Sequence, residues 1–445
     1  MAIPCTQPAE HIGDQVNGTV PMKLARVEIE NYRAIEKLHL PLHPSLTVLH
    51  GDNGHGKTSV LTAIATGLGS IPEQLPDVSS IVFLKSDRRG SRPLRVGLTA
   101  VDGITWDRRV GGPRRRNVLQ ALKDAMNAIV NADREETEPL DLPIVAFYDT
   151  DRAVFKPPQR RTGFGTKFPR YGALEGALSP RTDFRDFFEW FYAKENEELR
   201  EQKERQDFSS TLRDLEAVRQ AIQNMVPGAI NPRTKLSPLR FVVSIQLDDG
   251  KLEELSIDQL SGGYQIMLAL AADLARRMAQ GNPHRDDPLQ AEAVVLIDEI
   301  ELHLHPSWQQ RILTDLTRTF PNAQFIVSTH SPQVLTTVKP EHVVELQREQ
   351  GGIVAGSAAA PTYGAEAGDV LATVMGVDER PDPDGNKFVE KLADYTHLVA
   401  DGKGESSEAI SLRQELDELS PRDPALDRAD IEIRRRKLFR SMGRS

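Results

Sequence analysis

The stretch at residues 51–58, GDNGHGKT, constrains the fold of this chain more than any other. It fits the pattern G-x-x-x-x-G-K-[ST], and it lies between an apolar run, SLTVLH, and a segment with helical periodicity, KTSVLTAIATGL. A strand, a glycine-rich loop and a helix in this order direct backbone N–H groups and a helix N-terminus toward a phosphate group. The pattern predicts an α/β fold with a phosphate-binding loop. A glycine-rich turn without chemical use is the less favoured interpretation.

Each residue type in this loop suits a part of a nucleotide. Asn53, Gly54 and Gly56 belong to the backbone that we expect to curl around phosphate oxygens. Lys57 is expected to reach the β- and γ-phosphates, and Thr58 to hold Mg²⁺. The predicted cofactors are therefore ATP and Mg²⁺.

A second motif, LIDEIELHLHP at residues 296–306, supplies carboxylates at the end of a predicted strand. Asp298 ends the apolar run AVVLID, where an acidic side chain can orient Mg²⁺. Glu299 follows directly and is placed to take a proton from an attacking water molecule. The sequence therefore predicts Thr58 and Asp298 as metal residues and Glu299 as the catalytic base.

The two histidines in this motif, His303 and His305, allow two interpretations. Alternating histidines can ligate zinc, but this motif offers two such ligands and no partnering cysteine. The favoured interpretation places both on a loop at a nucleotide or subunit interface, with His303 among the nucleotide-binding residues.

The motif LSGGYQ precedes a long apolar segment that is predicted to be a helix. Ser261, Gly262 and Gly263 present a hydroxyl group, N–H groups and a helix N-terminus, which together suit an anion. Because the phosphate-binding loop already serves one side of a nucleotide, this second site has a natural use on the γ-phosphate held by a partner molecule.

The motif VSTHSP ends the last apolar run that is predicted as a core strand. His330 in this motif can donate a hydrogen bond to a γ-phosphate oxygen. It falls at the carboxyl edge of the predicted sheet, where ligand sites of α/β proteins form, so we count it among the catalytic residues.

Composition limits the class of protein and its compartment. The 445 residues are 39% hydrophobic and 27% charged, with a net charge of −10, which indicates a globular chain and argues against a protein that coats nucleic acid. The single cysteine, Cys5, is consistent with a reducing compartment, and no apolar run approaches the roughly 20 residues of a membrane helix. A polar N-terminus without signal-peptide features completes the expectation of a cytoplasmic protein without a membrane partner.

In the order GDNGHGKT, LSGGYQ, LIDE and STHSP, the chain resembles ABC-type ATPases of the RecF/SMC/OLD group. The resemblance implies a head-to-tail homodimer, or a higher homo-oligomer, in which each ATP lies between the Walker A motif of one subunit and the signature motif of the other. It also implies that ELHLHP lies at the D-loop position, and that Arg33 in ENYRAIEKL lies close to the nucleotide. A Q-loop glutamine is not assigned; AFYDTDR at residues 146–152 occupies the corresponding region.

Several segments, among them FFEWFYAKENEE and LIDEIELHLHPSWQQRI, are similar to bacterial AAA_21-like ATPases, which include the PtuA subunit of the Septu anti-phage system. This similarity implies an ATP-hydrolysing subunit of a defence complex that controls a separate nuclease of HNH type. No nuclease motif is recognised in the chain itself, since Asp382 and Asp384 are interpreted as a turn. The alternative is a RecF-like DNA-repair ATPase. Direct contact with DNA stays open, on basic clusters at residues 88–89, 114–116, 160–161 with Lys167 and Arg170, and 434–437.

The predicted architecture is a P-loop NTPase of ABC-ATPase type, with an antiparallel β subdomain and a hairpin at residues 102–103. We expect five segments. These are a flexible tail at 1–21, an N-terminal ATPase lobe at 22–155, a loop and helical insertion at 156–237, a C-terminal ATPase lobe at 238–345, and a helical C-terminal region at 346–445.

Overall fold

The structure is a computed structural model. It describes residues 22–112, 118–150, 164–165, 167–179, 184–246, 250–349, 352–357, 360–378 and 380–441. Contacts within the chain define two compact units, residues 1–370 and 371–445, and each is described by itself.

A six-stranded sheet in the order β13-β12-β3-β11-β10-β6 forms the centre of the first unit. Five strands run parallel, and only the edge strand β13 is antiparallel to its neighbour. The central strands are almost wholly apolar and buried, as a parallel sheet covered on both faces requires. The strands span Leu46–His50 (β3), Ile144–Tyr148 (β6), Ala293–Ile297 (β10), Ala323–Ser328 (β11), Val343–Glu349 (β12) and Gly352–Ser357 (β13).

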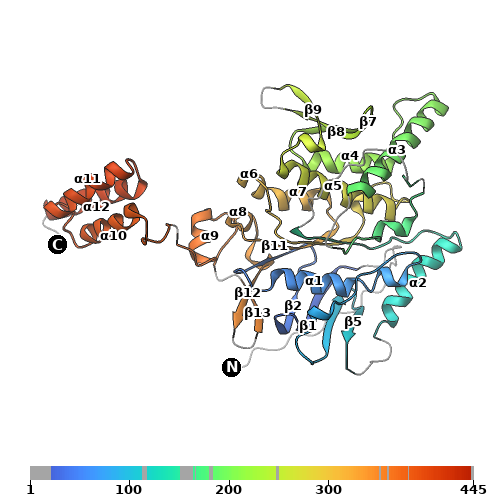
Figure 1. The fold of residues 1–445 in the computed structure, drawn as a ribbon, viewed down its shortest axis with the longest axis horizontal. Helices are drawn as coiled ribbons and strands as arrows, with labels where there is room; N and C mark the ends of the chain where they lie inside the picture. The colour runs from blue at the N-terminus through green and yellow to red at the C-terminus, as the bar shows by residue number, and fades with distance from the viewer. Residues whose placement is uncertain are drawn as a thin grey trace, which may run out of the picture. The chain divides into compact units, whose positions relative to one another are not determined.

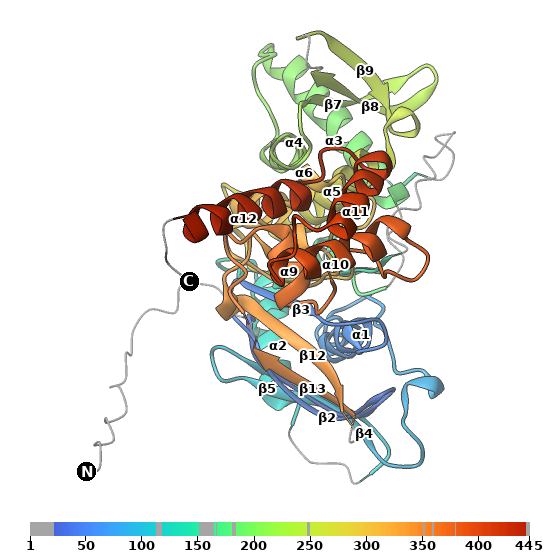
Figure 2. The same cartoon turned by 90° about the vertical axis from the view of Figure 1, so that its left-hand side faces the viewer.

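An antiparallel sheet in the order β2-β1-β4-β5 forms the predicted β subdomain. The predicted hairpin at residues 102–103 is confirmed, because β4 and β5 are joined there and Gly103 has a φ of 90°. Figure 2 shows β12 and β13 beside β2 of this sheet. Its strands are Leu24–Tyr32 (β1), Ile35–Pro41 (β2), Leu94–Ala100 (β4) and Thr105–Val110 (β5).

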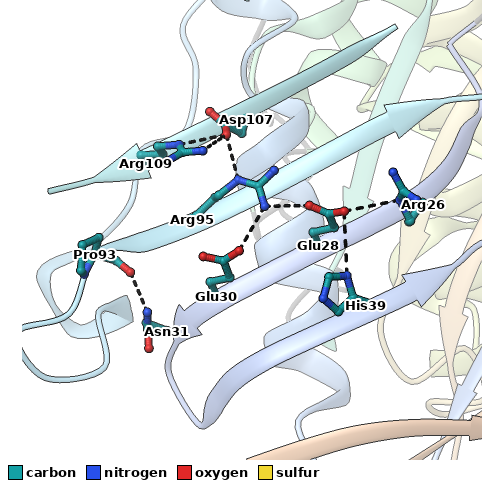
Figure 3. Close-up of polar contacts among 9 residues, drawn as sticks. All are labelled: Arg26, Glu28, Glu30, Asn31, His39, Pro93, Arg95, Asp107 and Arg109. Carbon is teal, nitrogen blue, oxygen red and sulfur yellow. Dashed lines mark hydrogen bonds and ion pairs between the residues drawn. The ribbon is translucent and has the colours of Figure 1, made fainter. Parts of the chain in front are cut away.

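One face of this antiparallel sheet carries a connected set of ion pairs (Figure 3). Arg95 is central, with Nε donating to Asp107 at 2.8 Å and Nη1 to Glu28 at 2.7 Å and Glu30 at 3.2 Å. Arg109 donates to the same Asp107 carboxylate, with Nε at 2.9 Å. The arginines at the centre of this face are therefore already neutralised by carboxylates of the same sheet.

Helices surround the central sheet, and a second group of elements extends from it (Figure 1). In that group α3 and α4 lie beside the three-stranded sheet β7-β8-β9. The helices are Lys57–Leu68 (α1), Gln120–Arg134 (α2), Phe184–Arg205 (α3), Arg213–Met225 (α4), Gly262–Gly281 (α5), Pro306–Gln309 (α6), Ile312–Thr319 (α7), Pro332–Leu335 (α8) and Ala367–Thr373 (α9), and the strands are Ala229–Leu236 (β7), Leu239–Gln246 (β8) and Leu252–Ser256 (β9).

Two of the expected segment boundaries differ from the observed elements. The boundary at residue 237 divides the β7–β8 hairpin, because β7 belongs to a three-stranded sheet and not to a helical insertion. The boundary at residue 345 divides β12, since the central sheet continues to Ser357. Both strands have polar, exposed outer positions, and their sequences therefore carry little strand pattern.

The second unit is helical, as the sequence predicts for this end of the chain. Its helices α10 (Lys387–Ala400), α11 (Ser407–Leu419) and α12 (Pro424–Ser441) enclose a small core of their own. Its most buried members include Tyr395, Leu416 and Leu426. Among the described residues of the chain, no helix is both long enough and apolar enough to cross a membrane.

Candidate nucleotide-binding site

The loop between β3 and α1 has the conformation that a phosphate-binding loop needs. Gly51, Gly54 and Gly56 all have positive φ angles, of 146°, 81° and 85°. A Cβ atom on Gly51 would lie 2.3 Å from the carbonyl oxygen of Leu346, and one on Gly56 would lie 2.3 Å from Ile353 Cδ1. The backbone angle therefore disfavours a side chain at all three positions, and the β12 backbone also excludes one at Gly51.

The Lys57 side chain is buried at the start of α1, and its ammonium group lies against the loop itself. Nζ donates to the carbonyl oxygens of Gly51 at 2.7 Å and Asp52 at 3.1 Å. Burial lowers the pKa of this ammonium, while the carboxylates of Asp298 and Glu299 oppose the shift. The cation is therefore held where the loop curls, at the place expected for the phosphates.

Thr58 and Asp298 come together as the sequence predicts for metal residues. Thr58 Oγ1 donates to Asp298 Oδ2 at 2.6 Å, across 240 residues of sequence. Asp298 is buried at the end of β10, and its other carboxylate oxygen accepts from Ser328 Oγ. A hydroxyl and a carboxylate oxygen are ligands that Mg²⁺ prefers, so this pair fits a magnesium ion.

Glu299 has a left-handed backbone conformation, with a φ of 47°. Its N–H group donates to Ser328 Oγ at 2.8 Å, so that one hydroxyl group contacts both acidic residues of the motif. Such a conformation is strained for a residue other than glycine and persists only where its surroundings fix it. The strand end therefore holds Glu299 beside Asp298 at some energetic cost.

His330 follows β11 at the same edge of the sheet and is half-buried. Its backbone N–H donates to Glu301 Oε1 at 2.5 Å, and the neighbouring Thr329 Oγ1 donates to Glu301 Oε2 at 2.8 Å. Glu301 therefore contacts the segment that carries His330.

The signature motif forms the start of α5, as the sequence predicts. Ser261 is the N-cap residue, and both Ser261 and Gly262 are exposed. Gln265 Nε2 holds the preceding turn by donating to the carbonyl oxygens of Ile257 and Leu260, both at 2.9 Å. The exposed N-terminus of α5 is thus supported from behind, and its face is accessible to an anion.

The residues after Asp298 and Glu299 pack against this signature motif. A Cβ atom on Gly263 would lie 2.9 Å from the carbonyl oxygen of His303, and the Tyr264 and Trp308 rings meet edge to face at 4.5 Å. His303 is exposed and has a φ of 61°. His303 and the signature motif therefore share one surface of the chain.

Two other residues have local partners. His305 is the N-cap residue of α6, and its Nδ1 lies 2.8 Å from Ser307 Oγ. Arg33 is fixed by Asp87, since its Nε donates to Oδ1 at 2.9 Å and its backbone N–H to the Asp87 carbonyl oxygen at 2.7 Å. The role of Arg33 near the nucleotide stays a prediction.

The end of β6, where the region of the unassigned Q-loop begins, lies beside the carboxylate motif. The Asp298 N–H donates to the Tyr148 carbonyl oxygen at 2.8 Å. The remainder of this loop, residues 151–163, lies outside the described residues, as do the arginines at 114–116 and 160–161 and the tail at 1–21.

A buried polar network connects β6 with α5. The Tyr148 hydroxyl donates to Asp273 Oδ2 at 3.0 Å, and Arg276 and Arg277 donate to the same carboxylate at 2.8 and 2.7 Å. Arg277 also donates to the carbonyl oxygen of Ala173 at 2.7 Å. Burial raises the pKa of Asp273, but the two guanidinium groups outweigh it and hold the pKa at about 2.

Sequence reasoning missed three supporting side chains: Ser328, Glu301 and Gln265. Ser328 lies two residues before His330 in VSTHSP, at the last position of a buried strand. A hydroxyl residue at the end of a buried strand, where a neighbouring parallel strand is followed by Asp298, could have indicated a hydrogen bond to that carboxylate. The contact of Glu301 with His330 depends on the turn geometry and had no counterpart in the sequence pattern.

These motifs at the carboxyl edge of one parallel sheet, together with the antiparallel subdomain, define a P-loop NTPase of the ABC-ATPase type. A family model, AAA_21, described as "AAA domain, putative AbiEii toxin, Type IV TA system", matches residues 46–336. This span exceeds half of the chain, and the chain belongs to the AAA_21 family.

The chain is also similar to individual curated proteins and solved structures. The chain is 28% identical to the retron Ec83 probable ATPase of Escherichia coli over 494 aligned positions, which cover 93% of this chain and 87% of the relative. It is 42% identical to Septu protein PtuA of Bacillus mycoides (strain KBAB4) over 95 positions, which cover 21% of this chain and 13% of PtuA. Among solved structures, the SmcHead bound to the C-winged helix domain of ScpA is similar at 17% identity, with a TM-score of 0.41. The match covers 75% of this chain and 97% of the SmcHead chain.

Proposed function

We propose that this chain binds and hydrolyses ATP as a subunit of a bacterial anti-phage defence complex. The observation that carries the proposal is the hydrogen bond of 2.6 Å between Thr58 Oγ1 and Asp298 Oδ2. It brings the loop after β3 and the carboxylates after β10 to one point, beside the buried ammonium group of Lys57. The groups that we assign to phosphate binding, metal binding and proton transfer therefore belong to one edge of the sheet.

The residues of the site have distinct parts in the proposed reaction. Lys57 and the N–H groups at the start of α1 bind and orient the phosphates. Glu299 accepts a proton from the attacking water, and His330 donates to the γ-phosphate. A magnesium ion held by Thr58 and Asp298 would neutralise phosphate charge as it develops.

We propose that the site is completed by a second copy of the chain. Ser261, Gly262 and His303 are exposed, whereas Lys57 and Asp298 are buried. A second molecule, arranged head to tail, would bring its own exposed helix N-terminus to the γ-phosphate. This arrangement gives the signature motif a ligand.

The role in defence is supported by the relatives. The match to a retron ATPase extends along almost the whole chain, and a partial match is to a Septu protein. We propose that ATP controls a separate partner nuclease of HNH type. The alternative is a RecF-like repair ATPase that acts on DNA without a dedicated nuclease.

The ATPase proposal is tested by comparing purified wild-type protein with Glu299→Gln. We expect phosphate release to fall by at least about 100-fold, because the proton acceptor is lost, while binding of a fluorescent ATP analogue is retained. Glu341→Gln, at an exposed position, is the matched control and should behave as wild type. Equal turnover in Glu299→Gln and wild type would contradict the catalytic assignment.

The partner is tested by affinity purification from the native operon, followed by mass spectrometry. Recovery of a nuclease in a fixed ratio to this chain is the expected result. Recovery of the chain alone, or with replication and repair proteins, would favour the RecF-like alternative.

A further inference from the structure

Two side chains of the segment at residues 299–309 bind the segment that carries His330. Glu301 lies in the turn after β10, Gln309 is the last residue of α6, and residues 329–331 follow β11. Neither side chain has a part in the proposed reaction. Their contacts join the two segments at two separate points.

The first connection is the carboxylate of Glu301. Its two oxygens accept from the His330 N–H at 2.5 Å and from Thr329 Oγ1 at 2.8 Å. Thr329 is completely buried, and its hydroxyl oxygen also accepts from the Ser331 N–H at 3.0 Å. The Glu301 side chain thus fixes the backbone on which the His330 imidazole is mounted.

The second connection is the amide of Gln309. Its Nε2 donates to the Leu304 carbonyl oxygen at 2.9 Å, and its Oε1 accepts from Ser331 Oγ at 2.6 Å. Ser331 is buried and is the N-cap residue of α8. One neutral side chain therefore joins the turn, the residue after His330 and the start of a helix.

We propose that Glu301 and Gln309 are positioning residues for His330, which hold the imidazole at the height of the γ-phosphate. This inference rests on the proposed function, in which His330 donates to that phosphate. Both residues act through hydrogen bonds to the His330 segment. An error of about 1 Å in the position of a catalytic group lowers turnover by up to about 100-fold without abolishing substrate binding.

The test separates turnover from binding in Glu301→Ala and Gln309→Leu. We expect kcat to fall by about tenfold in each variant, while the Kd of a fluorescent ATP analogue stays within about twofold of wild type. Glu301→Gln should recover most of the rate, because its amide can accept from the His330 N–H and donate to Thr329. Gln310→Leu, the same substitution at the exposed neighbouring position, should match wild type.

Hydrogen exchange of the His330 amide supplies a readout that does not need turnover. Its exchange should be at least about tenfold faster in Glu301→Ala, because the acceptor is gone, and unchanged in Glu341→Ala. An unchanged exchange rate, or wild-type kcat in both Glu301→Ala and Gln309→Leu, overturns the inference. A Glu301→Gln variant as slow as Glu301→Ala also overturns it, since the charge would then be the active feature. A wild-type protein without ATPase activity would overturn the proposed function, and the exchange rates would still decide the positioning contacts.

Discussion

At the scale of single residues, the end of β11 supports the two acidic residues that follow β10. One hydroxyl group, that of Ser328, contacts the Asp298 carboxylate and the Glu299 N–H. The two acidic residues therefore sit on a common support from the neighbouring strand. This support keeps one carboxylate directed at Thr58 and leaves the next residue in a left-handed conformation.

His303 is expected to affect turnover more than nucleotide binding. It is exposed beside the signature motif, and a second copy would meet both together. In His303→Ala we expect phosphate release to fall by about tenfold, with the Kd for Mg-ATP within about twofold of wild type. Steady-state kinetics and equilibrium binding measure the two quantities. Equal losses in both would show that His303 does not act at a closed dimer.

Most residues of the proposed site could be assigned from the sequence because they belong to motifs in which the chemistry requires a fixed spacing. The loop glycines, Lys57 and Thr58 lie within eight positions of one another. Glu301 could not be assigned in this way, since its partner depends on how a turn after β10 meets a turn after β11. The order of residues along the chain does not show that these two turns are in contact.

At the scale of elements, the buried network between β6 and α5 links the strand next to the carboxylate motif with the signature helix. Tyr148 ends β6, and Asp273 lies in the middle of α5. Buried charges of this kind are costly unless all partners are present. The network therefore fixes the angle between the strand and the helix that carry the two halves of the proposed site.

The free energy of unfolding should fall in acid because of Asp273. Its pKa is about 2 in the folded chain and about 4 when unfolded, so its contribution is present above pH 4 and is lost as the pH falls toward 2. The shift corresponds to about 2 kcal/mol. Urea denaturation between pH 6 and pH 2 measures it, with Asp273→Asn as the comparison. The variant should be less stable at pH 6 and show a weaker pH dependence, and an unchanged dependence would contradict this role.

Elements were predictable where an uninterrupted apolar run indicates a buried strand or apolar residues repeat with a helical period. The strands β3, β10 and β11 and the helices α1 and α5 agree with the sequence prediction. The segment after residue 306 forms two helices, α6 and α7, with a break at residues 310–311. The half-exposed strands β7, β12 and β13 were not predicted. Their residues show no clear strand pattern, and they are strands because they pair with neighbouring strands.

At the scale of the whole molecule, the exposed signature motif predicts a nucleotide-dependent dimer. Glu299→Gln with ATP should shift the chain from a lighter to a heavier species, because slow hydrolysis preserves the sandwiched nucleotide. Size-exclusion chromatography with light scattering measures the mass. Addition of ADP in place of ATP is the control and should give no shift. A mass that is the same with ATP, with ADP and without nucleotide would contradict nucleotide-dependent dimerisation.

The left-handed backbone at Glu299 and His303 has a consequence for engineering. Glycine adopts this conformation without strain, so Glu299→Gly and His303→Gly relieve a local cost that the native side chains impose. Selection for heat resistance would then favour glycine at the two positions where the proposed chemistry needs a carboxylate and an imidazole. A variant selected for thermal stability alone is therefore expected to gain stability and lose ATPase activity through substitutions at Glu299 and His303.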